Sequence, residues 1–335
     1  MNAPHTDETL IAPGLRAFMQ RIVDYAGMFP PADLPLREAM ESFLSYRAEP
    51  ERWMLNRFVL PTTRLDELRP FRQAIASNPP VGLSVLGQGG GTEEDFLEAF
   101  TADLDRIDTC IEDHNSHVRP DVMEVRLPAS LLNAFEAAPV SRFLEAVDSA
   151  LARHGLAHLD IFFEVPLTDA TAAQLPNVLP AFASANADQP VPEQSILGLK
   201  IRCGGMEPEL FPSVNQVARA IVACRDAGVR FKATAGLHHP ARHYDEQYEV
   251  MRHGFFNVFG AAVLAAEHTL DVDGVAAVLR EENAETFTFT QEGMQWGPLS
   301  ASVEDISHSR ATLAHSFGSC SFAEPVDELR ALSLM

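Results

Sequence analysis

Short apolar runs alternate along the chain with longer stretches in which apolar residues recur at helical spacing. The runs of strand length are "WMLNRFVLP" (53–61), "VGLSVLG" (81–87), "VMEVRLP" (122–128), "LDIFFEVP" (159–166), "ILGLKIRC" (196–203), "VRFKATAG" (229–236) and "FFNVFGA" (255–261). A weaker strand is expected near "RIVDYAGMF" (21–29). Strands that alternate with helices pair in parallel, so the pattern predicts an α/β sheet.

Helices are predicted between these strands, and two of them end in a basic residue followed by glycine, a common C-terminal signal. They include "TRLDELRPFRQAIAS" (63–77), "VSRFLEAVDSALARHG" (140–155), "VNQVARAIVACRDAG" (214–228) and "HYDEQYEVMRHG" (243–254). Eight strand–helix units in about 250 residues are typical of a (β/α)8 barrel, of the TIM type. The alternative, an open doubly wound sheet, usually carries a Gly-rich fingerprint after its first strand, and the sequence has none.

The barrel is expected to span 1–283, with 284–335 as a C-terminal extension packed on it. The extension contains a strand-like "TFTFTQ", a helix around 301–314 and the loop "HSFGSCSFAEP" (315–325). This loop is either a lid over the barrel mouth, carrying Ser319 or Cys320, or a plain surface loop.

Charged residues recur at two-residue spacing near the carboxyl ends of the predicted strands, where barrels carry their chemistry. Side chains at this spacing share one face, and if that face is the interior they line one cavity with a net positive charge. The charged residues are Glu124, Arg126, Glu164, Lys200, Arg202 and Lys232, and the polar Thr234 follows Lys232 at the same spacing. Burying such groups without partners costs several kcal/mol each, so they form either a structural ion-pair network or an anion-binding site.

The two lysines suggest the chemistry of the functional alternative. A lysine beside another cation in a desolvated site loses its proton more readily and becomes a nucleophile. We therefore expect one of Lys200 and Lys232 to form an imine with a carbonyl compound and the other to lower its pKa. Arg126 and Arg202 would hold an anionic group of the substrate, with Glu124 beside them.

The segments "LKIRCGG" and "FKATAGL", about thirty residues apart, resemble the paired lysine strands of deoxyribose-phosphate-aldolase-type class I aldolases. The resemblance implies that Lys200 is the Schiff-base lysine and Lys232 the tuning lysine. Thr234 and Gly236 match the small-residue turn of the family. The family's strand-six motif continues with Thr-Ser-Thr-Gly, where this chain has Ile-Arg-Cys-Gly, and its inward Asp is replaced here by Glu124 or Glu164.

Histidines follow the strand that carries Lys232. His238 at the strand mouth suits a general acid or base, because its ordinary pKa near 6.5 favours proton transfer, and Glu164 is the alternative proton carrier. His239 and His243 have the i, i+4 spacing of metal ligands, but no glutamate follows His239 in an H-E-x-x-H pattern. We therefore expect no metal and no cofactor.

Glycines after three predicted strands, in "RCGG" (202–205), "TAGL" (234–237) and "FGAA" (259–262), either bind an anion through backbone N–H groups or only make tight turns. The anion-binding alternative adds Gly236, Gly260 and Asn257 to the substrate-binding residues. By contrast, "GQGGGTEED" (87–95) contains a Thr92–Asp95 capping box followed by acidic residues, so it predicts a helix start.

The net charge of −22 disfavours nucleic-acid binding, and no apolar run has the length of a membrane span. The four cysteines are scattered along the sequence, which argues against a disulfide framework. The N-terminal segment lacks the features of a signal peptide, so we expect a cytoplasmic protein. Cys203, beside Arg202, is a better candidate for a reactive thiol than Cys320, which has no base near it in the sequence.

The sequence thus predicts a lyase or aldolase that forms a lysine Schiff base with a small anionic carbonyl compound. A metal-dependent isomerase or hydrolase, with Glu124, Glu164 and His238 as ligands, is one alternative. A non-catalytic barrel that binds small anions is the other. The sequence is compatible with a homo-oligomer and does not determine the oligomeric state.

Overall fold

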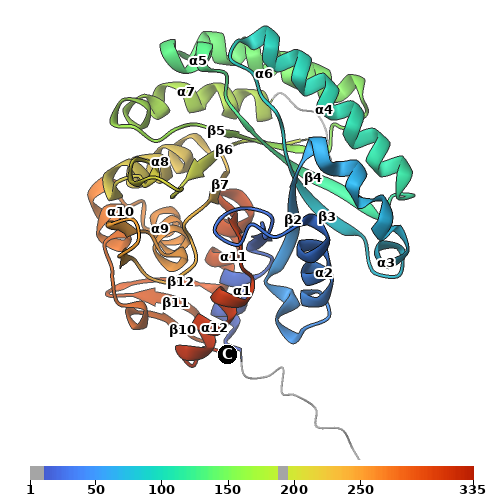
Figure 1. Cartoon of the computed structure of the whole chain (residues 1–335). Coiled ribbons are helices and arrows are strands. Elements are labelled where there is room, and N and C mark those ends of the chain that lie inside the picture. The colour runs from blue at the N-terminus through green and yellow to red at the C-terminus, as the bar shows by residue number, and fades with distance from the viewer. Residues whose placement is uncertain (1–10, 188–194) are drawn as a thin grey trace, which may run out of the picture.

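Eight parallel strands close into a barrel in the order β1-β13-β7-β6-β5-β4-β3-β2, which confirms the predicted (β/α)8 fold (Figure 1). The computed structural model describes residues 11–187 and 195–335, so the predicted absence of a leader peptide concerns residues that lie mostly outside this part of the chain. The barrel strands are β1 (Val23–Tyr25), β2 (Leu55–Pro61), β3 (Val81–Leu86), β4 (Val118–Arg126), β5 (Asp160–Glu164), β6 (Leu197–Arg202), β7 (Phe231–Thr234) and β13 (Ala314–Ser319).

Helices surround the barrel, and the capping boxes Thr92–Asp95 and Ser213–Gln216 begin two of them. The helices are α1 (Pro13–Met19), α2 (Leu36–Tyr46), α3 (Arg72–Ala76), α4 (Glu93–Asp113), α5 (Ala129–Ala134), α6 (Ala137–Arg153), α7 (Asp169–Ala187), α8 (Val214–Ala227), α9 (Phe255–His268), α10 (Val272–Leu279), α11 (Val303–Thr312) and α12 (Ala323–Ala331). The predicted helix over 63–77 is largely a 3₁₀ helix (Thr62–Phe71) followed by α3. No helix among the described residues is long and apolar enough to cross a membrane.

The eighth strand is not the predicted segment 255–261. That segment begins α9, whose first eleven residues are all buried, so its apolar residues form a continuous run that resembles a buried strand. The eighth strand is β13, which lies in the segment predicted as a loop. The expected boundary at residue 283 is therefore wrong, because the C-terminal segment supplies a strand of the barrel.

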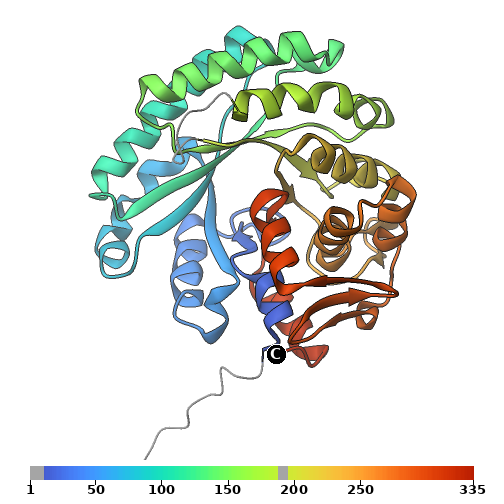
Figure 2. The same cartoon turned by 180° about the vertical axis from the view of Figure 1, so that it is seen from behind.

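Residues between α9 and β13 form an elaboration on the barrel, visible from behind in Figure 2. It contains α10, a three-stranded antiparallel sheet and α11. The sheet strands are β10 (Phe287–Phe289), β11 (Gly293–Trp296) and β12 (Leu299–Ser302). The predicted strand in "TFTFTQ" and the predicted helix around 301–314 are both confirmed.

The predicted helix over 243–254 is also wrong, because this segment contains the strands β8 (His243–Asp245) and β9 (Val250–Arg252) of an antiparallel hairpin. Asp245 Oδ1 accepts hydrogen bonds from the backbone N–H groups of Gln247 (2.9 Å) and Tyr248 (3.2 Å). Such a side-chain contact favours a turn over a helix.

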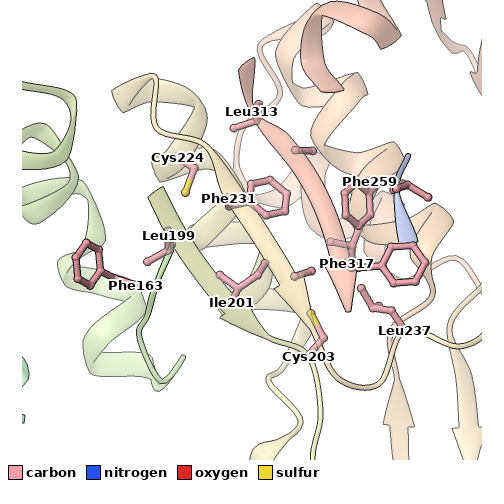
Figure 3. Packing of buried hydrophobic residues seen from close by; sticks show 14 of the residues in the cluster. Phe163, Leu199, Ile201, Cys203, Cys224, Phe231, Leu237, Phe259, Leu313 and Phe317 are labelled. Carbon is pink, nitrogen blue, oxygen red and sulfur yellow. The ribbon is translucent and has the colours of Figure 1, made fainter. Parts of the chain in front are cut away.

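A continuous apolar layer lies between the strands and their helices. Figure 3 shows part of it, in which Leu199 and Ile201 of β6 lie with Phe231 of β7, Cys224 of α8 and Phe259 of α9. Because successive strand residues face opposite sides, this packing directs Lys200 and Lys232 to the barrel interior.

Candidate active site

Strand register places the predicted charged residues side by side inside the barrel. Glu164 of β5 pairs in register with Lys200 of β6, and Lys200 pairs with Lys232 of β7. Arg126 of β4 pairs with Glu164 from the other side. The expectation that these side chains share one interior face is therefore met for Lys200, Lys232 and Glu164.

Lys232 lies in the closed part of the interior and is fully buried. Its ammonium group lies 2.8 Å from Glu124 Oε1, donates a hydrogen bond to Ser84 Oγ (3.0 Å) and forms an ion pair with Asp24. Ser316 of β13 donates to Asp24 as well. Lys232 thus connects strands β1, β3 and β4 to its own strand across the barrel.

Lys200 lies beside this group, at the side that faces solvent. Its Nζ lies 2.9 Å from Glu124 Oε2 and 3.0 Å from Glu164 Oε2. Glu124 therefore bridges the two lysines, with one oxygen on each. Positive and negative groups alternate from Arg57 through Asp24, Lys232, Glu124, Lys200 and Glu164 to Arg202.

This alternation sets the charge states of the site. Burial alone would raise the pKa of Glu124, but the ammonium groups of Lys200 and Lys232 lower it far below its usual range. Burial alone would likewise lower the pKa of Lys200, but Glu124 and Glu164 raise it above its usual value. The expectation that the pKa of Lys200 is lowered is therefore wrong for the resting site, because the two carboxylates in contact with Lys200 raise it.

A cavity of about 230 Å³ opens above Lys200. Its lining is formed by residues at the ends of the barrel strands and by the β8–β9 hairpin, and it includes Glu124, Lys200, Arg202, Thr234, Gly236, His238, Gln247, Tyr248, Arg252, Gly318 and Cys320. Gly236 has φ +79°, and a Cβ there would lie 2.9 Å from the carbonyl oxygen of Cys203, so the turn requires glycine. Lys232 is absent from the lining, so Lys200 is the lysine that a substrate can reach.

Two arginines border the cavity, but they are not the predicted pair. Arg202 lies there, with its nearest carboxylate oxygen, on Glu164, 3.9 Å away. Arg126 also contacts Glu164, at 3.5 Å, but its side chain is 68% exposed and lies outside the lining. Arg252, from the hairpin, is the second arginine and is paired with Asp245 at 2.6 Å.

His238 lies at the cavity wall, as predicted, and its Nδ1 is 2.7 Å from Glu324 of α12. His239 pairs with Glu328 of the same helix at 2.6 Å, so both histidines hold α12 to the loop after β7. Across residues 11–187 and 195–335, no three His, Cys, Asp or Glu side chains are grouped as metal ligands. The alternative ligand set Glu124, Glu164 and His238 is thus not assembled.

Two predicted substrate-binding residues lie away from the cavity. Asn257, fully buried in α9, donates to the carbonyl oxygens of Val278 and Glu281, both at 2.9 Å. Gly260 lies within the same helix, where it faces Phe287 and Met294. The predicted strand over 255–261 would place both residues at a strand end, whereas both lie inside the helix α9.

Three residues of the site are not among those predicted from the sequence: Asp24, Arg252 and Glu324. Asp24 carries the same signal as Lys232, since it is a charged residue inside a short apolar run, "RIVDYAG". The position of Arg252 beside the cavity was not predicted, because the sequence indicates a helix where the structure has the β8–β9 hairpin. Glu324 comes from the other end of the chain, and no local pattern indicates its contact with His238.

The His238–Glu324 pair predicts a pH dependence of stability. Burial alone would lower the pKa of His238, but hydrogen bonds with Cys320 and Glu324, together with their charges, raise it to about 9. The stabilisation is complete below the unfolded value near 6.5 and is lost as the pH rises through about 9. Urea unfolding at pH 6.5 and pH 9.5 should show a loss on the order of 1–2 kcal/mol that His238→Gln abolishes. An unchanged loss in that variant would contradict the assignment.

No protein-family model matches the chain, and no curated protein matches it. Among solved structures, the chain is similar to "QR15, an Aldolase", with 11% sequence identity and a TM-score of 0.41. The match covers 64% of this chain and 80% of that one. The closed barrel and its interior charges are therefore the basis for the functional argument.

Proposed function

We propose that this protein is a lyase of the aldolase type, which forms a Schiff base between Lys200 and a small carbonyl compound that carries a carboxylate or phosphate. One observation carries the proposal: Lys200 borders the cavity while two carboxylates hold its ammonium group at 2.9 and 3.0 Å. A lysine in this position has proton acceptors beside it and a substrate-sized space in front of it.

The proposed reaction begins with proton transfer from Lys200 to Glu164. A substrate anion that binds Arg202 competes with Glu164 for that cation, and this raises the proton affinity of Glu164. The free amine then attacks the carbonyl carbon, and loss of water from the carbinolamine leaves an iminium ion. Cleavage of the bond between the α and β carbons sends its electron pair into the iminium to give an enamine, as the β-hydroxyl loses its proton and becomes the carbonyl of the departing fragment. Glu164, ionised again once it has protonated the departing water, accepts this proton, and the protonated His238 donates one to the enamine carbon from the cavity wall.

Lys232 has a different role in this proposal from the one that the sequence suggested. Its ammonium group is bound to Asp24 and Glu124 and does not reach the cavity. Lys232 therefore acts as a positioning residue, which fixes the Glu124 carboxylate against Lys200. Lys200 is the nucleophile and Lys232 the positioning residue because Lys200 borders the cavity, whereas Lys232 lies deeper in the barrel.

The anion-binding role of Arg202 gives a direct test. Arg202→Gln should raise the KM for an anionic carbonyl substrate by about 10- to 100-fold, the loss expected when a charge-assisted contact of 1.5–3 kcal/mol is removed. Steady-state kinetics on acidic and uncharged analogues of one substrate would measure this. Arg126→Gln is the matched control, because Arg126 shares the partner Glu164 but lies outside the cavity. Equal effects of the two substitutions would contradict the assignment.

A non-catalytic anion-binding barrel is the second candidate, and the cations at the mouth favour it. Arg202, Arg252 and Lys200 all border the cavity and suit an anion whether or not chemistry follows. A thermal shift with small carboxylates, in a protein that shows no proton exchange or imine formation with carbonyl compounds, would select this alternative.

A further inference from the structure

One nucleophilic side chain of the cavity has no role in the proposed reaction. Cys320 follows β13 directly and lines the same cavity as Lys200. Its Sγ lies 3.8 Å from Nε2 and 3.9 Å from Nδ1 of His238. Because Nδ1 faces Glu324 at 2.7 Å, Nε2 is the nitrogen that can exchange a proton with the thiol.

This arrangement has the components that activate a thiol. A cysteine beside a protonated histidine is held as the nucleophilic thiolate, and a carboxylate on the far nitrogen keeps the histidine protonated. The carboxylate here is Glu324, whose pKa is lowered chiefly by its hydrogen bond with His238. The three side chains come from the loop after β7, the end of β13 and α12.

The other cysteines provide an internal contrast. All four cysteines are buried, but Cys110, Cys203 and Cys224 do not line this cavity, whereas Cys320 does. Burial raises the pKa of Cys110 and of Cys203 to about 12, and it raises that of Cys224 as well. The expectation that Cys203 is the better reactive thiol is therefore wrong, because its burial keeps it protonated.

We propose that Cys320, activated by His238 and Glu324, is a covalent modification site for small anionic electrophiles that enter the cavity. The anionic preference follows from Arg202, Arg252 and Lys200, which border the same space and raise the local concentration of anions. This inference goes beyond the proposed function and does not depend on imine formation at Lys200.

Iodoacetate, an anionic alkylating agent, is a suitable probe for this reaction at Cys320. The thiol proton passes to Nε2 of His238 as the sulfur attacks the methylene carbon of the probe. A carbon–sulfur bond forms as the carbon–iodine bond breaks, and iodide leaves with the electron pair. The product is a carboxymethyl thioether at Cys320, whose carboxylate lies among the cations of the mouth.

The experiment treats the folded protein at pH 7 with limiting iodoacetate or with uncharged iodoacetamide, and maps the adducts by peptide mass spectrometry. Cys320 should be labelled first, and the other cysteines only after unfolding. The ratio of the iodoacetate rate to the iodoacetamide rate should exceed that of glutathione by about tenfold. This comparison needs no variant and so remains valid if the substitutions impair folding.

Two variants test the activation. His238→Gln should slow labelling of Cys320 about tenfold, since an ordinary thiol is only a few per cent ionised at pH 7, and Glu324→Gln should have a smaller effect in the same direction. Preferred labelling of Cys203, a rate ratio equal to that of glutathione, or an unchanged rate in His238→Gln would each overturn the proposal.

Discussion

Replacement of Lys200 by methionine should abolish the proposed Schiff-base chemistry. The enamine formed from a lysine imine exchanges α-protons of its carbonyl partner with solvent, so a small keto acid such as pyruvate should become deuterated in heavy water. Loss of the nucleophile should reduce this exchange by about 10³-fold or more. Proton NMR of the keto acid with wild type and variant measures the effect.

Lys200→Arg is the matched control for this experiment. Arginine keeps a cation between Glu124 and Glu164, so the ion pairs of the site persist, but a guanidinium that stays protonated is not a nucleophile. Both variants should therefore be inactive, and the arginine variant should retain more of the wild-type stability. Exchange at the wild-type rate in Lys200→Arg would show that imine formation is not the mechanism.

Lys232→Met should lower the free energy of unfolding by about 3–5 kcal/mol. The substitution removes the shared partner of Asp24 and Glu124 and leaves each of these buried carboxylates with one cation, Arg57 for Asp24 and Lys200 for Glu124. The loss of one counter-ion from each buried carboxylate is costly because water does not replace it. Urea denaturation at pH 7, analysed for wild type and variant, measures the difference.

A surface pair provides the reference for that loss. Arg37 lies 3.7 Å from Glu41 with side chains 69% and 60% exposed, so Arg37→Ala should change stability by at most about 1 kcal/mol. Adding Asp24→Asn to Lys232→Met should recover part of the loss, because it removes one of the two buried carboxylates that lost a cation. A loss of less than about 1 kcal/mol in Lys232→Met would mean that the buried network does not stabilise the fold.

The sequence predicted the barrel because seven of its eight strands carry local signals. Apolar runs with short polar interruptions mark β2 to β7, and even β1, with only three residues, was expected near its position. The two-residue spacing of Lys200 and Arg202, and of Lys232 and Thr234, was enough to place these side chains inside. The lysines and the cavity-facing arginine of the candidate site were thus predictable.

Other features depend on tertiary contacts that leave no local pattern. β13 reads as a polar loop because Ser316 and His315 contact charged partners in the barrel, Asp24 and Arg57. α9 reads as a strand because it is buried on all sides. The raised pKa of Lys200 depends on carboxylates brought from β4 and β5, which no pattern around the lysine reveals.

Borohydride trapping tests the central claim most directly. The protein is incubated with a pool of small aldehydes and keto acids that carry carboxylate or phosphate groups, reduced with sodium borohydride, and digested for peptide mass spectrometry. The account predicts a reduced adduct at Lys200, none at the enclosed Lys232, and none in Lys200→Arg. Because Lys200 and Lys232 are the only lysines of the sequence, an adduct at Lys232, or no adduct at Lys200 with any compound of the pool, would contradict it.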